Sequence, residues 1–335
     1  MPNQFPTATD VLSAMRNSKV SLKLKELENG SVIQKGIRTI LYSGGYSIVF
    51  PYNKANGEKV AVRCWVADIG EAKKRSQILS NHLAKLNSPY FVGFKYVDNA
   101  ILINGIFNPL IIMDWIEGQM LKDFLSQNIN NKNKILAVAN KFKGMVQYFH
   151  EKNIAHGDLQ HGNILIKKSG ELVAIDYDSM YVDELKGLPD NVKGLPGYQH
   201  PARQKNKTIS PQLDYFSETV IYLSLLVYSE MSQLWDRYKD TEDLLFSKED
   251  FLNPSQSEII RTLSKSNNKQ IADLTNKMKE SLSESSIDNL CCLEENLIDK
   301  KKVAMQNIFD KFEKQPNPPN NEPVFPKISD ILSKF

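Results

Sequence analysis

The chain has 335 residues, 41% of them hydrophobic and 24% charged, which is enough for one large globular domain or two modest ones. A formal net charge of only +3 gives no support for binding to nucleic acid or to a membrane surface. The N-terminus is too polar for a signal peptide, no apolar run is long enough to span a bilayer and the cysteines are few, so we expect a cytoplasmic protein.

The first third of the chain is rich in predicted strands. Residues 1–35 are expected to form an N-terminal extension, in which Thr7 and Asp10 resemble the capping box of a helix. A strand-rich part then covers residues 36–115 and contains one helix over 71–86. Its expected strands are residues 38–42, 46–52, 59–66, 101–103 and 110–115.

The pattern becomes helical in residues 116–312. Apolar residues at intervals of three and four predict a long amphipathic helix over 135–149. A helix over 214–228 is apolar on nearly every side and is therefore expected to be buried. Between these helices, short strands are expected at 164–166 and 172–175.

The tail, residues 313–335, has a different composition. Its proline-rich part, residues 315–326, suits neither a helix nor a central strand, because proline lacks the backbone donor. The last eight residues again carry apolar side chains at helical spacing. We expect this short helix to dock in a groove of this chain or of a partner protein.

The segment HGDLQHGNIL, residues 156–165, carries the chemistry of the chain. Asp158 and Asn163 lie five residues apart in a loop, and Asp176 lies thirteen residues further on, at the end of an apolar strand. Phosphoryl transfer requires a carboxylate that orients the attacking hydroxyl and oxygen ligands that hold Mg²⁺ on the phosphates. Asp158 suits the first role, whereas Asn163 and Asp176 suit the second.

These motifs resemble those of the protein kinase superfamily, in particular a bacterial, eukaryotic-like serine/threonine kinase branch. The His156–Asn163 loop resembles H-R-D-x-x-x-x-N, and Asp176-Tyr177-Asp178 resembles D-F-G. Residues 60–65, 110–118 and 194–203 resemble the V-A-I-K strand, the hinge and the end of the activation segment. The resemblance implies a two-lobed α+β fold that uses ATP and Mg²⁺ to phosphorylate Ser or Thr of protein substrates.

The same resemblance implies a set of nucleotide contacts. The turn and strands of the first lobe would cover the phosphates and the base, and the hinge would meet the adenine edge. The implied residues are Gly44, Gly45, Ser47, Val49, Ala61, Arg63, Met113, Asp114 and Ile116.

Several positions depart from the family pattern. Arg63 stands where the family has lysine, and the following helix has no acid at the expected place near residues 77–79. Gln160 replaces the lysine of the catalytic loop, and Gly157 replaces an arginine. These departures leave two alternatives open: a pseudokinase that binds nucleotide or acts as a scaffold, and a small-molecule phosphotransferase, which the HGDL motif favours.

The remaining expectations concern structural residues. Asp214 should cap backbone donors under the catalytic loop, His156 should be packed and His161 solvated. No set of Cys and His has the spacing of a zinc motif, and the pair Cys291-Cys292 is expected to be buried on a helix.

The activation segment, residues 180–207, contains no Ser or Thr, and its only hydroxyls belong to Tyr181 and Tyr198. We therefore expect it to be ordered without phosphorylation. Its order should come from the packing of Leu185, Leu188 and Leu195.

Overall fold

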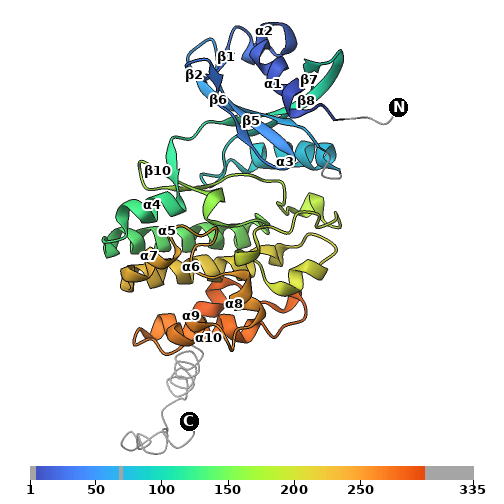
Figure 1. Cartoon of the computed structure of the whole chain (residues 1–335). Helices are drawn as coiled ribbons and strands as arrows, with labels where there is room; N and C mark the ends of the chain where they lie inside the picture. The colour runs from blue at the N-terminus through green and yellow to red at the C-terminus, as the bar shows by residue number, and fades with distance from the viewer. Residues whose placement is uncertain (1–4, 68–70, 299–335) are drawn as a thin grey trace, which may run out of the picture. The chain divides into compact units, whose positions relative to one another are not determined.

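The computed structural model describes residues 5–67 and 71–298 (Figure 1). The chain divides into a compact unit of residues 1–296 and a second unit of residues 297–335, almost all of which lies outside the described residues. The proline-rich linker and terminal helix expected within residues 313–335 therefore belong to the part that is not described. In the described part, no helix is both long and apolar enough to cross a membrane.

A six-stranded antiparallel sheet forms the first part of the compact unit. Its strand order is β1-β5-β6-β8-β7, and β4 pairs with the N-terminal part of β5. The strands are β1 (Ser31–Val32), β4 (Tyr42–Ser43), β5 (Ser47–Asn53), β6 (Lys59–Trp65), β7 (Phe94–Ile103) and β8 (Ile106–Asp114). A separate small hairpin joins β2 (Gln34–Lys35) to β3 (Arg38–Thr39).

The β5–β6 hairpin reverses at the Asn56-Gly57 turn. Gly57 has φ +85°, a left-handed conformation that glycine adopts without steric cost. In β6, Val60, Val62 and Cys64 enter the core of this lobe, which leaves Ala61 and Arg63 on the opposite face. The alternation of the strand thus turns Arg63 away from the hydrophobic core.

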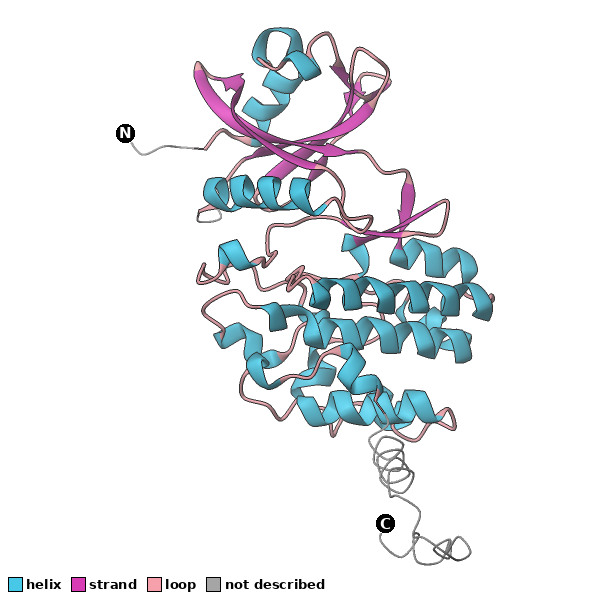
Figure 2. Ribbon diagram, turned by 180° about the vertical axis from the view of Figure 1, so that it is seen from behind, coloured by secondary structure: helices cyan, strands magenta, loops and turns pink. Residues whose placement is uncertain are grey.

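Helices cover both faces of the sheet (Figures 1 and 2). Helices α1 (Ala8–Arg16) and α2 (Ser18–Ser21) belong to the N-terminal extension, and Val11 and Met15 of α1 join the core of the sheet. The capping box expected at the start of α1 is confirmed, with Asp10 N–H donating to Thr7 Oγ1 at 3.2 Å. Helix α3 (Ala72–Leu86) packs against β7.

The second part of the compact unit is mainly helical (Figure 2). Its helices are α4 (Leu121–Asn128), α5 (Lys132–Glu151), α6 (Tyr215–Glu230), α7 (Trp235–Tyr238), α8 (Lys248–Leu252), α9 (Glu258–Leu263), α10 (Lys269–Ser281) and α11 (Leu293–Leu297). A three-stranded sheet of β9 (Gly118–Met120), β10 (Ile164–Lys167) and β11 (Leu172–Ala174) lies in the order β11-β10-β9. Helix α6 is buried along nearly its whole length against α5, as its composition predicts.

The prediction for the cysteine pair is wrong. Both residues precede α11: Cys291 is exposed and Cys292 is half-buried. Helix α11 begins only after Cys292, because the carbonyl of Cys292 accepts the N–H of Asn296 while its own N–H donates to Glu295. Cys292 is therefore a helix cap rather than a residue of a buried helix face.

Candidate active site

One buried carboxylate, that of Asp214, stabilises the loop between α5 and β10. Asp214 accepts the backbone N–H of His156 and, at 2.9 Å, that of Gly157. His156 is fully buried; its Nε2 lies 2.8 Å from the carbonyl of Ile175, and its Nδ1 accepts the N–H of Asp158 at 3.3 Å. The structural roles predicted for Asp214 and His156 are confirmed.

The backbone explains why residue 157 is glycine. Gly157 has φ +78°, and a Cβ at this position would collide with the carbonyl of Ser179. No side chain fits there, so the chain cannot carry an arginine at residue 157.

Asp158 and Asn163 lie together at the mouth of the loop. Asn163 donates from Nδ2 to the Asp158 carbonyl at 2.8 Å and to Asp158 Oδ2 at 3.2 Å. The other carboxylate oxygen, Oδ1, accepts the N–H of Leu195 at 3.1 Å. Burial raises the pKa of Asp158 above its ordinary value of 3.8.

The carboxylate of Asp176 is partly exposed to solvent. Its side chain is 52% exposed and its backbone has φ +68°, which few non-glycine residues adopt. Both hydrogen bonds of Asn163 leave from Nδ2, so the amide Oδ1 remains for a cation. Carboxylate and amide oxygens are the ligands that Mg²⁺ prefers, and the residues present therefore fit this ion.

Arg63 reaches into the same region with its whole guanidinium. Its side chain is only 5% exposed; Nε donates to Ser47 Oγ at 2.8 Å, and Nη1 lies 3.2 Å from Asp176 Oδ1. Nη2 forms an ion pair with Asp178 Oδ2. Burial opposes the charge, yet Asp178 and Asp176 raise the pKa of the guanidinium, so the buried arginine stays charged.

A cavity of about 120 Å³ brings many of the predicted residues together. Six of them line it: Gly44, Gly45, Ser47, Arg63, Asp158 and Asp176. Four lining residues were not assigned from the sequence: Tyr46, Asp178, Ser179 and Val192. For Asp178 a signal existed, because a second aspartate follows Asp176 where the family motif has glycine.

The other predicted nucleotide contacts lie outside the lining of that cavity. Ala61 is paired in register with Met113 across β6 and β8, and Val49 is paired with Arg63 across β5 and β6. The carboxylate of Asp114 accepts the N–H of Gly93 at 2.9 Å, and the N–H of Asp114 donates to the Gly93 carbonyl at 3.2 Å. Ile116 is half-buried just after β8, and Asn163 is buried in the catalytic loop.

The activation segment is held by charge as well as by packing. Arg203, which is fully buried, donates to both oxygens of Asp190 at 3.2 and 3.3 Å. Lys193 lies 3.2 Å from the same carboxylate. Of the expected leucines, only Leu185 is fully buried, whereas Leu188 and Leu195 are half-buried.

Helix α3, which lacks the expected acid near residues 77–79, instead holds the activation segment through a cation, Arg75. Arg75 is buried and donates to the carbonyls of Met180 at 3.0 Å and Pro189 at 3.3 Å. These two hydrogen bonds link helix α3 to the activation segment at residues 180 and 189.

The prediction that His161 is solvated is wrong. His161 forms a hydrogen bond with the Tyr198 hydroxyl, and burial lowers the pKa of its imidazole to about 4.

Comparison with known proteins agrees with this geometry. Residues 37–295 match the family described as the protein kinase domain. The chain belongs to the protein kinase family. Its kinase-like α+β fold, with an antiparallel sheet in the first part and helices in the second, is thus confirmed.

Similar curated kinases come from fungi. Serine/threonine-protein kinase STE20 of Saccharomyces cerevisiae is 22% identical over 51% of this chain and 18% of its own length. The STE20 kinase of Eremothecium gossypii is 21% identical over 63% of this chain and 22% of its own length. Serine/threonine-protein kinase SMU1 of Mycosarcoma maydis is 18% identical over 64% of this chain and 29% of its own length. The chain therefore spans less than a third of these relatives.

Proposed function

We propose that this kinase transfers the γ-phosphoryl group of ATP to Ser or Thr hydroxyls of protein substrates. The observation that carries the proposal is the lining of one cavity by Asp158, Asp176, Arg63 and the Gly44-Gly45 turn. A positioned base, an oxygen ligand for a cation and a buried guanidinium are the parts that phosphoryl transfer requires. The printed names of the fungal relatives favour protein Ser/Thr as the acceptor.

Each polar residue has a role that follows from its contacts. Asp158 would orient the acceptor hydroxyl and take its proton, with one oxygen fixed by the Leu195 N–H. Asn163 Oδ1 and Asp176 would hold Mg²⁺. When bound, this ion supplies positive charge that neutralises the phosphates.

Arg63 would contact the phosphates in place of the family lysine. Asp178 and Ser47 fix the position of its guanidinium, so that Asp178 would do the work of the missing helix acid. Gly44 and Gly45 would lie over the phosphates, because neither has side-chain atoms that would obstruct them.

The adenine site would lie between the two lobes, 36–115 and 116–312. Val49 and Ala61 would cover the base, and Met113 would lie behind it. The main chain of Asp114 and Ile116 would meet its edge.

The assignment of this chain to a bacterial kinase branch stays a prediction. It rests on the motifs DYD, residues 176–178, and GLPGYQHPAR, residues 194–203.

One observation favours a pseudokinase instead. Arg63 contacts both Asp176 and Asp178, so the proposed metal ligand is already paired with a cation. Gln160 also brings no charge to the catalytic loop; it accepts the N–H of Gly162 at 2.8 Å. A protein that bound nucleotide without turnover would keep this arrangement.

Transfer of radiolabelled phosphate from ATP separates these functions. The purified chain should label itself or a generic protein such as casein in the presence of Mg²⁺, and Asp158→Asn should not. ATP binding without transfer would support the pseudokinase. Labelling of an aminoglycoside but of no protein would support the small-molecule phosphotransferase.

A further inference from the structure

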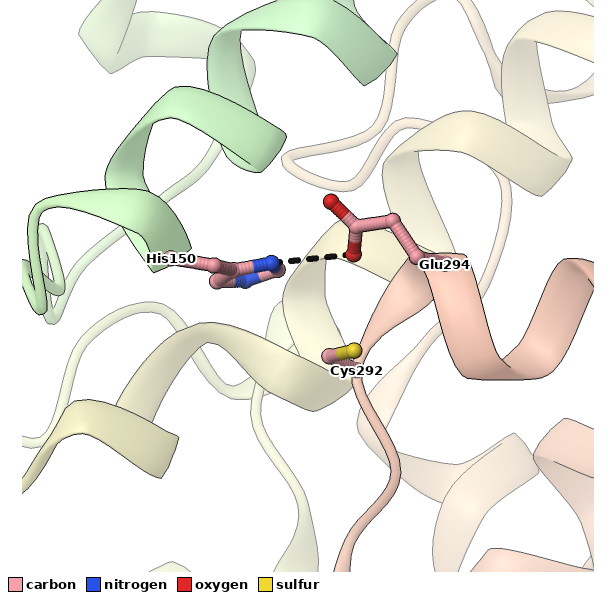
Figure 3. Close-up of side chains that lie close together, drawn as sticks. All are labelled: His150, Cys292 and Glu294. Atoms are coloured by element: carbon pink, nitrogen blue, oxygen red, sulfur yellow. Dashed lines mark ion pairs between the residues drawn. The ribbon is translucent and has the colours of Figure 1, made fainter.

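A second group of potential ligands lies away from the cleft, where the end of α5 meets the start of α11. His150, Cys292 and Glu294 each offer one ligand atom, and the three atoms lie within 4.8 Å of one another (Figure 3). His150 is in the last turn of α5, and Glu294 is in the first turn of α11. The ligand atoms thus come from two segments that are distant in the sequence.

The ligand atoms of His150 and Glu294 have few partners apart from one another. His150 Nδ1 and Glu294 Oε2 are 2.9 Å apart in an ion-pair contact, drawn as a dashed line in Figure 3. Apart from this contact, neither atom has a hydrogen-bond partner in the described part of the chain, nor has Glu294 Oε1, although all three atoms are shielded from solvent. Buried polar atoms are nearly always satisfied, so their convergence indicates a ligand at this point.

The other ring nitrogen of His150 is held by a buried carboxylate. Glu218, only 2% exposed, lies 2.7 Å from His150 Nε2, and its second oxygen accepts the N–H of Leu293 at 3.2 Å. A carboxylate on one ring nitrogen fixes the orientation and tautomer of a histidine whose other nitrogen binds a metal. The arrangement therefore points Nδ1 at Cys292 and Glu294.

The charges around His150 favour a cation. Two carboxylates, Glu218 and Glu294, face one imidazole. A dication bound between His150, Cys292 and Glu294 would be balanced by the negative charge of these carboxylates.

We propose that His150, Cys292 and Glu294 bind a zinc ion. Imidazole, thiolate and carboxylate are the three ligand types that Zn²⁺ uses, and a mixed set of this kind excludes Mg²⁺ and Ca²⁺, which require oxygen ligands. Water or a further donor would complete the tetrahedron. The ion would connect the start of α11 to the end of α5. The sequence shows no local zinc motif because residue 150 and residues 292 and 294 come together only in the folded chain.

Zinc titration of the full chain tests this inference. The protein is stripped with a chelator and titrated with Zn²⁺ against a chromogenic chelator, in excess Mg²⁺ so that the nucleotide cleft does not take up zinc. We expect one equivalent to bind. Cys292→Ser should weaken the affinity at least tenfold, whereas the matched control Cys291→Ser, which changes the exposed neighbouring thiol, should leave it unchanged.

Cobalt substitution reports the ligands directly. Co²⁺ should give a thiolate-to-metal charge-transfer band in wild type and Cys291→Ser but not in Cys292→Ser. Failure of wild type to bind Zn²⁺ would overturn the proposal, and equal loss in both cysteine variants would place the metal elsewhere. If Cys292→Ser does not fold, Glu294→Gln takes its place, and wild-type affinity in that variant overturns the proposal.

Discussion

Arg63 of β6 forms an ion pair with Asp178, in the loop after β11, in addition to its ion pair with Asp176, and the described structure shows no ion pair of Arg63 with an acid of helix α3. The helix presents Arg75 instead, and that residue binds backbone carbonyls. The acid that balances this buried cation thus lies in the loop, two residues after Asp176, and not in the helix.

The first prediction follows from this exchange. Asp178→Ala should lower kcat/KM for ATP by about thirtyfold, because it removes a charge-assisted hydrogen bond of about 2 kcal/mol and frees Arg63 to move. Steady-state kinetics measure the effect. Glu71→Ala is the control: this exposed residue is the N-cap of α3, and its carboxylate forms an ion pair with Lys74 at 3.2 Å. Equal losses in the two variants would contradict the role of Asp178.

Arg63→Ala extends the same test to the partner. It should weaken both ATP affinity and turnover, and a double-mutant cycle with Asp178→Ala should show losses that are not additive, because the two residues act as one unit. Unchanged ATP binding by Arg63→Ala would remove Arg63 from the site.

A second prediction concerns the two carboxylates that we propose for phosphoryl transfer. Asp158→Asn and Asp176→Ala should each reduce phosphoryl transfer about a hundredfold or more while the fold stays intact. Transfer assays and circular dichroism check the two halves of this statement. Wild-type transfer by Asp176→Ala would exclude the proposed mechanism.

The third prediction concerns the order of the activation segment. Asp190→Ala leaves the guanidinium of Arg203 buried without its acid, and we expect a loss of about 3–5 kcal/mol in the free energy of unfolding. Denaturant unfolding measures it. Lys186→Ala, an exposed change in the same segment, should stay within about 0.5 kcal/mol of wild type.

The corresponding modification test uses mass spectrometry of active protein. Asp190 already supplies the negative charge that Arg203 and Lys193 require, so activity should need no phosphate. Stoichiometric phosphate on Tyr181 or Tyr198, together with loss of activity after phosphatase treatment, would contradict this prediction.

The fourth prediction is a pH dependence of stability. His200 is 2% exposed; Nδ1 accepts the N–H of Ala202 at 3.1 Å, and Nε2 lies 3.0 Å from the carbonyl of Ser281. These contacts require a neutral ring, and burial lowers its pKa below the ordinary 6.5, although the Ser281 carbonyl and Glu284 oppose this. The unfolded chain then takes up a proton that the folded chain refuses, so stability should fall as the pH drops below about 6.5. Melting temperatures measured across this range should decline less in His200→Gln.

Much of the fold was predictable because its signals are local. The capping box of Thr7 and Asp10, the Asn56-Gly57 turn and the apolar spacing of α5 each depend on residues that are neighbours in the chain. The cavity residues that a known motif contains could also be assigned, since motif spacing fixes Asp158 and Asp176.

The long-range pairs could not be predicted in the same way. Arg63 with Asp178 and Arg203 with Asp190 are brought together by packing, and nothing near either arginine in the sequence names its partner. The prediction for Cys292 was wrong because it treated the two cysteines as part of a buried helix face. Cys292 instead caps the start of α11, and this position decides how exposed its side chain is.

The contacts of Arg75 have a consequence for how this kinase can diverge. Both acceptors are main-chain oxygens, which every residue type supplies. The side chains of Met180 and Pro189 can therefore change over evolutionary time without breaking the link between α3 and the activation segment. Substitution of Arg75 would remove both of these bonds at once, while the contact of His82 with Glu184 at 3.1 Å would remain between the two segments. For the two Arg75 bonds, related sequences would therefore show no matching change at residues 180 and 189.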